Sequence, residues 1–355
     1  MTTILAAIFV FGVLITVHEF GHFITAKMTG MRVDEFAIGF GPNIFQKKVG
    51  ETLYSLRIIP LGGYNKIAGM DPEEPDSDDS FKSKSIPARM LVILAGSLMN
   101  FLLPIILFFS IFMINGIQKP VDQPILGTIM EDKAAAQAGL QVGDRILAIN
   151  GEKIATWNDL VVTLQKYPDK EITVTAEHQG AVKNYQMTPA YDAQYGRPLI
   201  GISPTYEQYQ PGVVEAATMG AGYTKYIIFA MIDGLQKIIT GAAPADVSGP
   251  IGVAKMAGEM ANQGMLPLLN FIAFLSINLG VINLLPLPAL DGGHFVLLVL
   301  EAVRGKPLGA RATNAIQMVG VAIILSITVL AVFNDIKIGR AHVRTPVTLG
   351  DLVCR

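Results

Sequence analysis

Long apolar runs alternate along the chain with shorter segments that carry charge. Residues 4–26, 90–117, 266–290 and 315–333 are each long enough to cross a bilayer as a helix, which takes about 20 apolar residues. Two prolines near the end of the third run are expected to interrupt its helix and to free backbone groups there. The pattern therefore predicts a polytopic α-helical membrane protein with four transmembrane helices.

Lysine and arginine are concentrated in residues 27–89, between the first two runs, and in residues 304–311, before the last run. Basic loops of membrane proteins tend to lie on the cytoplasmic side. Placing both of these loops inside the cell puts the segment between the second and third runs, and both chain ends, outside.

The first basic segment also carries a β pattern. Residues 52–59 and the following Pro60-Leu61-Gly62-Gly63-Tyr64 indicate a strand, a turn and a second strand, after a glycine-rich apolar stretch at residues 34–45. Such a hairpin can re-enter the membrane only where it lines a cavity in the protein, and a small surface sheet is the alternative. Residues 71–79, with two prolines among six acidic residues, predict a solvated linker.

Charges and short β-like runs return between residues 124 and 204. Residues 138–151, Ala-Gly-Leu-Gln-Val-Gly-Asp-Arg-Ile-Leu-Ala-Ile-Asn-Gly, closely resemble the part of a PDZ domain in which a helix leads through a tight turn into a strand and an Asn-Gly hairpin. PDZ domains bind an extended chain by strand addition beside a helix. We expect an inserted α+β domain that either binds a peptide ligand or acts as a folded plug.

Residues 219–239 are apolar but are interrupted by Lys225, Asp233 and Lys237. At roughly 100° per residue the three charges lie on one side of a helix and the large apolar side chains on the other. The pattern predicts an amphipathic helix at the membrane interface, and a fifth span is the alternative.

The composition agrees with a membrane protein, since 51% of the residues are hydrophobic and only 16% are charged. A net charge of −2 argues against nucleic-acid binding. The only cysteine, Cys354, provides neither a disulfide framework nor a set of thiolate ligands. The first run lacks the basic start and the cleavage site of a signal peptide, so we expect it to be retained as a span.

Residues 338–355 look unlike the rest of the chain and resemble the translation of a sequencing adapter. We expect this tail to be an artefact that takes no part in the fold, so that the natural C-terminus is missing beyond about residue 337.

The first apolar run contains His18-Glu19-Phe20-Gly21-His22. Positions i and i+4 of a helix share a face, so the two imidazoles can bind one metal ion, with Glu19 placed to accept a proton from an attacking water. A structural polar cluster is the alternative, but ionisable residues inside a membrane usually serve function. The second run adds a small, polar stripe of Gly96, Ser97 and Asn100, whose amide needs a partner in lipid.

Catalytic zinc sites usually have three protein ligands and one open position, so a third ligand is needed. The candidates near the membrane are Asp291 and His294. Asp291 is favoured because it ends an uncharged run, where an unpaired carboxylate is costly. His294 is then a neighbour of the site.

Three motifs in this order resemble the site-2 protease family of intramembrane zinc metalloproteases, and in particular its bacterial RseP group. They are the His-Glu-x-x-His motif, the Gly-x-x-x-Asn of residues 96–100, and Asn-Leu-Leu-Pro-Leu-Pro-Ala-Leu-Asp-Gly at residues 283–292. Matches at residues 38–41, 57–64 and 248–252 extend the resemblance over nearly the whole chain.

The resemblance implies Zn2+ held by His18, His22 and Asp291, with Glu19 as the general base. It also implies that Asn283, and with it Asn278, holds the substrate backbone or polarises the scissile carbonyl. The hairpin of residues 57–67 corresponds to a membrane-reentrant β element that pairs with an unwound substrate. The remaining residues expected to meet the substrate are Gly62, Gly63, Pro286 and Pro288. We also expect Gly21, Gly292 and Gly293 to leave room for a water path.

The chain departs from the family in two places. It has room for one PDZ domain, where the best-known enterobacterial members have two, and Asn65 stands where a valine is common. The expected division is residues 1–117 for the N-terminal membrane part, 118–204 for the PDZ domain, 205–265 for the interfacial helix and a linker, 266–337 for the C-terminal membrane part and 338–355 for the tail.

By this analogy the protein is an endopeptidase of the bacterial inner membrane that cleaves transmembrane segments of single-span proteins. The implied substrates are anti-sigma factors of an envelope stress response such as the sigma-E response, and remnant signal peptides. A catalytically idle scaffold that presents the PDZ domain, and a metal transporter, are the alternatives. Intact Glu19 argues against a scaffold, and a single ligand set argues against transport.

Overall fold

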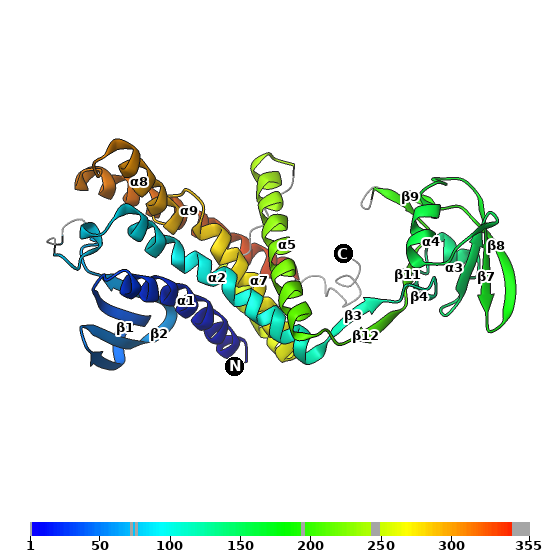
Figure 1. Cartoon of the computed structure of the whole chain (residues 1–355), viewed down its shortest axis with the longest axis horizontal. Helices are drawn as coiled ribbons and strands as arrows, with labels where there is room; N and C mark the ends of the chain where they lie inside the picture. Colours follow the sequence, from blue (N-terminus) through cyan, green and yellow to red (C-terminus); the bar gives the residue numbers. More distant parts are fainter. Residues whose placement is uncertain (1, 72–73, 75–76, 193–195, 243–248, 343–355) are drawn as a thin grey trace. The chain divides into compact units, whose positions relative to one another are not determined.

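The computed structural model describes residues 2–71, 74, 77–192, 196–242 and 249–342 (Figure 1). The chain divides into two compact units, one made of Met1–Ile111 with Val213–Arg355 and the other of Phe112–Gly212. The expected PDZ segment lies inside the second unit. Residues 343–355 of the expected tail, with Cys354, lie outside the described residues.

The first unit consists mainly of helices. Four helical segments in the described part of the chain are long and apolar enough to cross a membrane, namely Thr2–Met28, Ile86–Asn115, Met265–Asn283 and Ala310–Phe333. The prediction of a polytopic helical membrane protein with four transmembrane helices is therefore confirmed. The helices of this unit are α1 (Thr2–Met28), η1 (Phe81–Ser83, a 3₁₀ turn), α2 (Ile86–Asn115), α5 (Val213–Ile239), α6 (Pro250–Gln263), α7 (Met265–Asn283), α8 (Asp291–Arg304) and α9 (Ala310–His342).

The third transmembrane helix ends earlier than its apolar run does. Helix α7 stops at Asn283, residues 284–290 form a chain of turns, and α8 begins at Asp291. The turns fold back tightly, because a Cβ on Gly292 would lie 2.3 Å from the carbonyl oxygen of Leu285 and one on Gly293 would lie 2.2 Å from that of Leu287. The two glycines therefore allow the backbone to reverse directly before the second half of this segment.

Helix α6 is an element that the sequence analysis described only as part of a linker. Asp335 of α9 accepts hydrogen bonds from the backbone N–H groups of Gly249 and Gly252, both at 2.9 Å, and so caps the start of α6. Ala257 of α6 packs in a core with Val10 of α1 and with α7. The C-terminal part of the chain is thereby tied to its first helix.

Helix α5 contains the predicted amphipathic segment and begins six residues before it, at Val213. Its first half packs closely on α2, where a Cβ on Gly220 would lie 3.0 Å from the backbone nitrogen of Phe109. In its second half both the charged and the large apolar side chains are exposed; Phe229, for example, is 60% exposed. α5 is not one of the four helices long and apolar enough to span a membrane in the described chain, and its position at the interface stays a prediction.

Two long strands, β1 (Val33–Val49) and β2 (Thr52–Ile67), follow α1 and pair with each other. Ile38 of β1 has two partners, Leu56 and Gly63, so the chain reverses direction between these residues of β2. This reversal agrees with the turn predicted at Pro60 to Tyr64, although both of its arms belong to one strand.

A partly buried charge cluster holds this hairpin together. Arg57 Nη2 donates to Glu35 Oε1 at 2.9 Å, and Ser55 Oγ donates to the same oxygen at 2.6 Å. The Tyr64 hydroxyl donates to the other carboxylate oxygen. Burial alone would raise the pKa of Glu35, but these hydrogen bonds outweigh it and hold the pKa of this carboxyl below its ordinary value.

The second unit has the architecture expected of a PDZ domain. A four-stranded antiparallel sheet in the order β6-β5-β7-β8 packs with helix α4 around one apolar core. The predicted Asn-Gly hairpin joins β5 to β6, and Asn150 and Gly151 have left-handed φ values of 49° and 81°. The elements are β3 (Ile117–Pro120), β4 (Leu126–Ile129), α3 (Ala134–Gln137), β5 (Arg145–Ile149), β6 (Glu152–Lys153), α4 (Trp157–Leu164), β7 (Ile172–His178), β8 (Ala181–Met187), β9 (Ala190–Asp192), β10 (Arg197–Leu199), β11 (Ile202–Pro204) and β12 (Tyr206–Tyr209).

Candidate metal centre

Two glycines allow α1 and α2 to approach closely at the His-Glu-x-x-His motif. A Cβ on Gly21 would lie 2.3 Å from the carbonyl oxygen of Ala95 in α2. A Cβ on Gly96 would lie 2.3 Å from His22 Nε2 and 2.7 Å from His18 Cε1. Any side chain at Gly96 would therefore displace the imidazoles, so glycine at this position leaves the room that they occupy.

The second nitrogen of each imidazole is held by α2. His22 Nδ1 lies 2.8 Å from the carbonyl oxygen of Val92, to which its N–H donates. His18 Nδ1 lies 3.1 Å from the side-chain amide of Asn100. These contacts turn both Nε2 atoms toward one point, where they lie 3.2 Å apart. Hydrogen bonds of this kind orient histidine ligands in metal sites.

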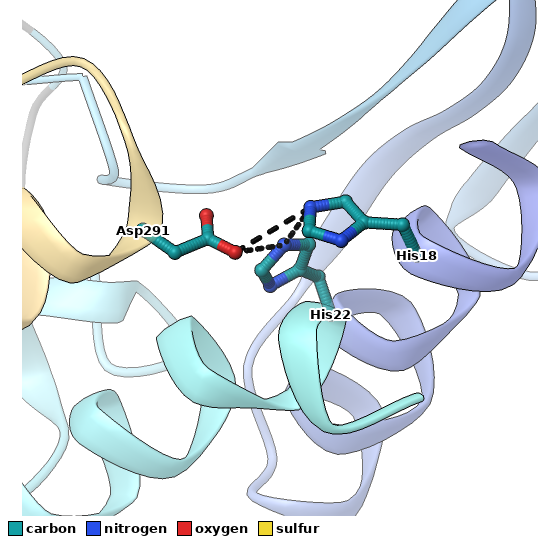
Figure 2. Close-up of side chains that lie close together, drawn as sticks. All are labelled: His18, His22 and Asp291. Carbon is teal, nitrogen blue, oxygen red and sulfur yellow. Dashed lines mark hydrogen bonds and ion pairs between the residues drawn. The ribbon is translucent and has the colours of Figure 1, made fainter. Parts of the chain in front are cut away.

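Asp291, from the C-terminal part of the chain, is the third candidate ligand beside the two histidines. Its Oδ2 lies 3.4 Å from His18 Nε2 and 3.5 Å from His22 Nε2, as Figure 2 shows. Ser97 Oγ lies 3.3 Å from the same oxygen. Asp291 is the first residue of α8, so the turns after α7 place its carboxylate opposite the histidines.

The spacing of these three atoms fits a tetrahedral metal ion. Bonds of about 2.1 Å at tetrahedral angles place ligand atoms about 3.4 Å apart, which is close to the observed 3.2, 3.4 and 3.5 Å. Two imidazole nitrogens and a carboxylate oxygen are donors that suit zinc, and they leave a fourth position open.

Asn100 provides a second test of the fit. Its Oδ1 is buried and has no hydrogen-bond partner among the described residues. The two ends of a carboxamide have the same shape, so rotating the group would let Oδ1 accept the proton of His18 Nδ1. His18 Nε2 would then carry a free lone pair for a metal ion, and the buried oxygen would be satisfied.

The group borders a cavity of about 320 Å³ within the first unit. Glu19 and Asn283 line it, and Asn283 Nδ2 lies 3.5 Å from His18 Nε2. His294 lines the cavity too, but it is not part of the close group of ligand atoms. The full lining is His18, Glu19, His22, Tyr64, Asn65, Ile67, Met70, Val92, Asn283, Ala289, Leu290, Asp291 and His294.

The other residues expected to meet the substrate lie at different distances from this cavity. Gly63 is close, since a Cβ there would lie 3.2 Å from Glu19 Cγ, and Gly62 precedes it in the same strand. Pro286 and Pro288 belong to the turns that supply two lining residues. Asn278 is half-buried on α7 and is not one of the lining side chains.

The expected water path through Gly21, Gly292 and Gly293 is wrong. All three glycines lie against backbone carbonyl groups and leave no room. A second cavity of about 570 Å³ shares Tyr64, Asn65 and His294 with the first and extends to Lys66, Glu74, Asn314 and Gln317.

Two contacts at the site were missed from the sequence. The carbonyl of Val92 holds His22, and a backbone group leaves no sequence signal. Asn65 donates to Glu19, although its departure from the common valine was the available clue. Asn100, by contrast, was recognised as an amide that needs a partner, and His18 is that partner.

Sequence comparison finds similar proteins along almost the full length of the chain. The profile of peptidase family M50 matches residues 6–327. A Clostridium acetobutylicum protein with a provisional zinc metalloprotease name is 36% identical over 334 residues, which are 94% of this chain and 97% of that protein. The regulator of sigma-W protease RasP of Bacillus subtilis is 31% identical over 418 residues, covering 95% of this chain and 99% of its own. The zinc metalloprotease RasP of Geobacillus kaustophilus is 32% identical, with 95% and 98% covered.

Proposed function

The chain belongs to peptidase family M50 and is a membrane-embedded zinc metalloprotease of the site-2 type, and we propose that it cleaves the transmembrane segments of single-span membrane proteins. The observation that carries the proposal is the meeting of His18, His22 and Asp291 beside a cavity that Glu19 also lines. These three side chains would hold the zinc ion. When bound, zinc supplies the Lewis acidity that polarises a carbonyl and lowers the pKa of water toward about 7.

Glu19 is the general base in this proposal. Its carboxylate accepts a proton from the attacking water and returns it to the amine that leaves when the peptide bond breaks. Asn283 holds the substrate backbone near the scissile carbonyl, since its amide reaches to 3.5 Å from His18 Nε2. Asn278 lies five residues before Asn283 on α7, outside the cavity lining, and its part in substrate binding stays a prediction from the resemblance.

A substrate helix hides its amide groups in internal hydrogen bonds, so it has to unwind before cleavage. Strand β2 offers replacement partners next to the cavity, where residues 63–67 pair with β1 on one side. Gly62 and Gly63 lie at the start of this segment, and in the proposal the substrate backbone passes next to them. The turns that contain Pro286 and Pro288 supply two lining residues of the cavity, and in the proposal they also meet the substrate.

The names of relatives and the charge pattern support a proposal for the substrate class and for the orientation in the membrane. A B. subtilis relative is named a regulator of sigma-W protease, which suggests anti-sigma factors as substrates here, with remnant signal peptides as a second group. The basic loops place the hairpin on the cytoplasmic side of the bacterial cytoplasmic membrane. The PDZ domain is then extracytoplasmic, where it binds a peptide or restricts access by size.

Cleavage of a tagged single-span substrate in membranes tests this function. The intact chain is expected to cut the substrate within its transmembrane segment. Glu19→Gln is expected to abolish cleavage while bound zinc stays at the level of the intact protein, because the amide cannot accept the proton but leaves the three ligands in place. Equal turnover by the two proteins would remove Glu19 from its role.

A further inference from the structure

Asn65 of β2 and Glu19 of α1 are joined by two hydrogen bonds across 46 positions of sequence. The side-chain Nδ2 of Asn65 donates to Glu19 Oε2 at 2.7 Å. The same nitrogen donates to the backbone carbonyl of Glu19, also at 2.7 Å. One amide thus holds both the main chain and the carboxylate of a single residue.

The orientation of this amide is fixed by what surrounds it. Nδ2 faces two oxygens of Glu19, and exchanging the ends of the amide would place a third oxygen against them. The Oδ1 of Asn65 is buried and has no hydrogen-bond partner among the described residues. The side chain is therefore used as a donor, at the expense of its acceptor.

The same strand also limits the stem of the Glu19 side chain. A Cβ on Gly63 would lie 3.2 Å from Glu19 Cγ, so β2 lies directly against that carbon. A glutamate has three rotatable side-chain bonds and samples many conformers unless it is packed and bonded. Contact at Cγ and a charge-assisted hydrogen bond at Oε2 together select one conformer, which faces the cavity.

We propose that Asn65 is a positioning residue that holds the carboxylate of Glu19 in its working orientation through the Nδ2 hydrogen bond. The inference rests on the proposed function, in which Glu19 is the general base. It also means that β2, the strand proposed to pair with the substrate, fixes the group that moves the proton.

Misplacing a catalytic group by about 1 Å can cost about 100-fold in rate. We therefore expect Asn65→Leu, which keeps the shape but removes the donor, to lower kcat by about 10- to 100-fold. Bound zinc is expected to stay unchanged, because the hydrogen bonds of this amide go to Glu19 and not to the three ligands. KM is expected to stay within about twofold, because the proposed pairing with the substrate uses the backbone of β2 and leaves this side chain on Glu19. Asn65→Asp is expected to lose at least as much activity, since two carboxylates would face each other.

Steady-state cleavage of a tagged single-span substrate, with zinc content measured on each preparation, tests the inference. Asn65→Gln keeps a carboxamide donor and is expected to recover part of the lost kcat. Asn43→Leu is the matched control, because Asn43 is an exposed amide of the same hairpin that bonds to Gln46, and its kcat should equal that of the intact protein.

The following results would contradict the positioning role of Asn65 or the proposed function. An Asn65→Leu protein with normal kcat would overturn the positioning role while an inactive Glu19→Gln left the proposed function standing. A raised KM with normal kcat would assign Asn65 to substrate binding, and loss of zinc would assign it to the fold of the site. An active Glu19→Gln would overturn the proposed function itself.

Discussion

Gly96 determines how closely the two imidazoles can meet. It lies beneath them on α2, and a single added carbon would fall 2.3 Å from His22 Nε2, which is closer than nonbonded atoms approach. The side chains would have to turn away from Asp291, and the three ligand atoms would separate.

Gly96→Ala is expected to lower zinc affinity at least tenfold and to reduce cleavage in proportion. Competition with a metal chelator measures the affinity. The matched control is Gly12→Ala on α1, where an added Cβ meets nothing within 4 Å and zinc affinity should stay unchanged. Normal zinc affinity in Gly96→Ala would contradict the role given to this glycine.

At the level of single residues, the sequence predicts the candidate metal ligands better than the hydrogen bonds that hold them in place. The spacing of His18 and His22 on one helix face is a local property, and the cost of a lone carboxylate in lipid singles out Asp291. The hydrogen bonds of Val92 and Asn65 arise only when separate elements pack together. No pattern along the chain encodes them.

Helices α2 and α8 are held together at both ends of their contact. Near the metal group, Ser97 of α2 lies against Asp291 at the start of α8. Farther along, Arg89 forms a two-pronged ion pair with Glu301, with nitrogen to oxygen distances of 2.6 and 3.2 Å. The two side chains are only 10% and 15% exposed. The pair therefore fixes the position of the helix that carries the third ligand.

Glu301→Ala is expected to cost about 3 kcal/mol of unfolding free energy, because it leaves a largely buried guanidinium without its partner. Exchange of the two residues, Arg89→Glu with Glu301→Arg, should recover part of that loss. Denaturant unfolding in detergent micelles measures both. Asp233→Ala is the control, since it breaks an exposed ion pair with Lys237 on α5 and should cost less than about 1 kcal/mol. No recovery in the exchanged protein would show that the pair itself does not stabilise the contact.

Elements with a strong hydrophobic pattern were predicted correctly. An element whose start depends on a contact with a distant part of the chain was not. The four spans follow from uninterrupted apolar runs that are long enough for a helix to cross a bilayer. The third was expected to be interrupted near Pro286 and Pro288, and its helix does end shortly before them, at Asn283, although apolar character continues up to Leu290. Helix α6 was missed because its start depends on Asp335, which lies 86 positions away from Gly249.

The second unit is inserted into the first through neighbouring strands. Ile117 of β3 lies opposite Tyr209 of β12, so the chain leaves and returns at adjacent points. The three ligands come from α1 and α8 and their supporting contacts from α2, all within the first unit. Folding of the site therefore does not require the PDZ domain to supply any of these residues.

Replacing residues 117–209 by a short Gly-Ser linker is expected to leave zinc content unchanged. The shortened protein should still cleave, with weaker discrimination between a full-length substrate and one whose extracytoplasmic part has been removed. Comparing the rates for these two substrates measures the effect. A folded, zinc-loaded but wholly inactive protein would contradict the accessory role of the PDZ domain.

The whole account depends on one zinc ion held jointly by the first helix and by a residue 273 positions after His18. X-ray absorption at the zinc edge, measured on the purified protein, reports the ligands directly. We predict two imidazole nitrogens and carboxylate or water oxygens at about 2.0–2.1 Å, no sulfur, and loss of a ligand in Asp291→Ala. An intact zinc shell in Asp291→Ala, or a shell without both imidazoles, would contradict it.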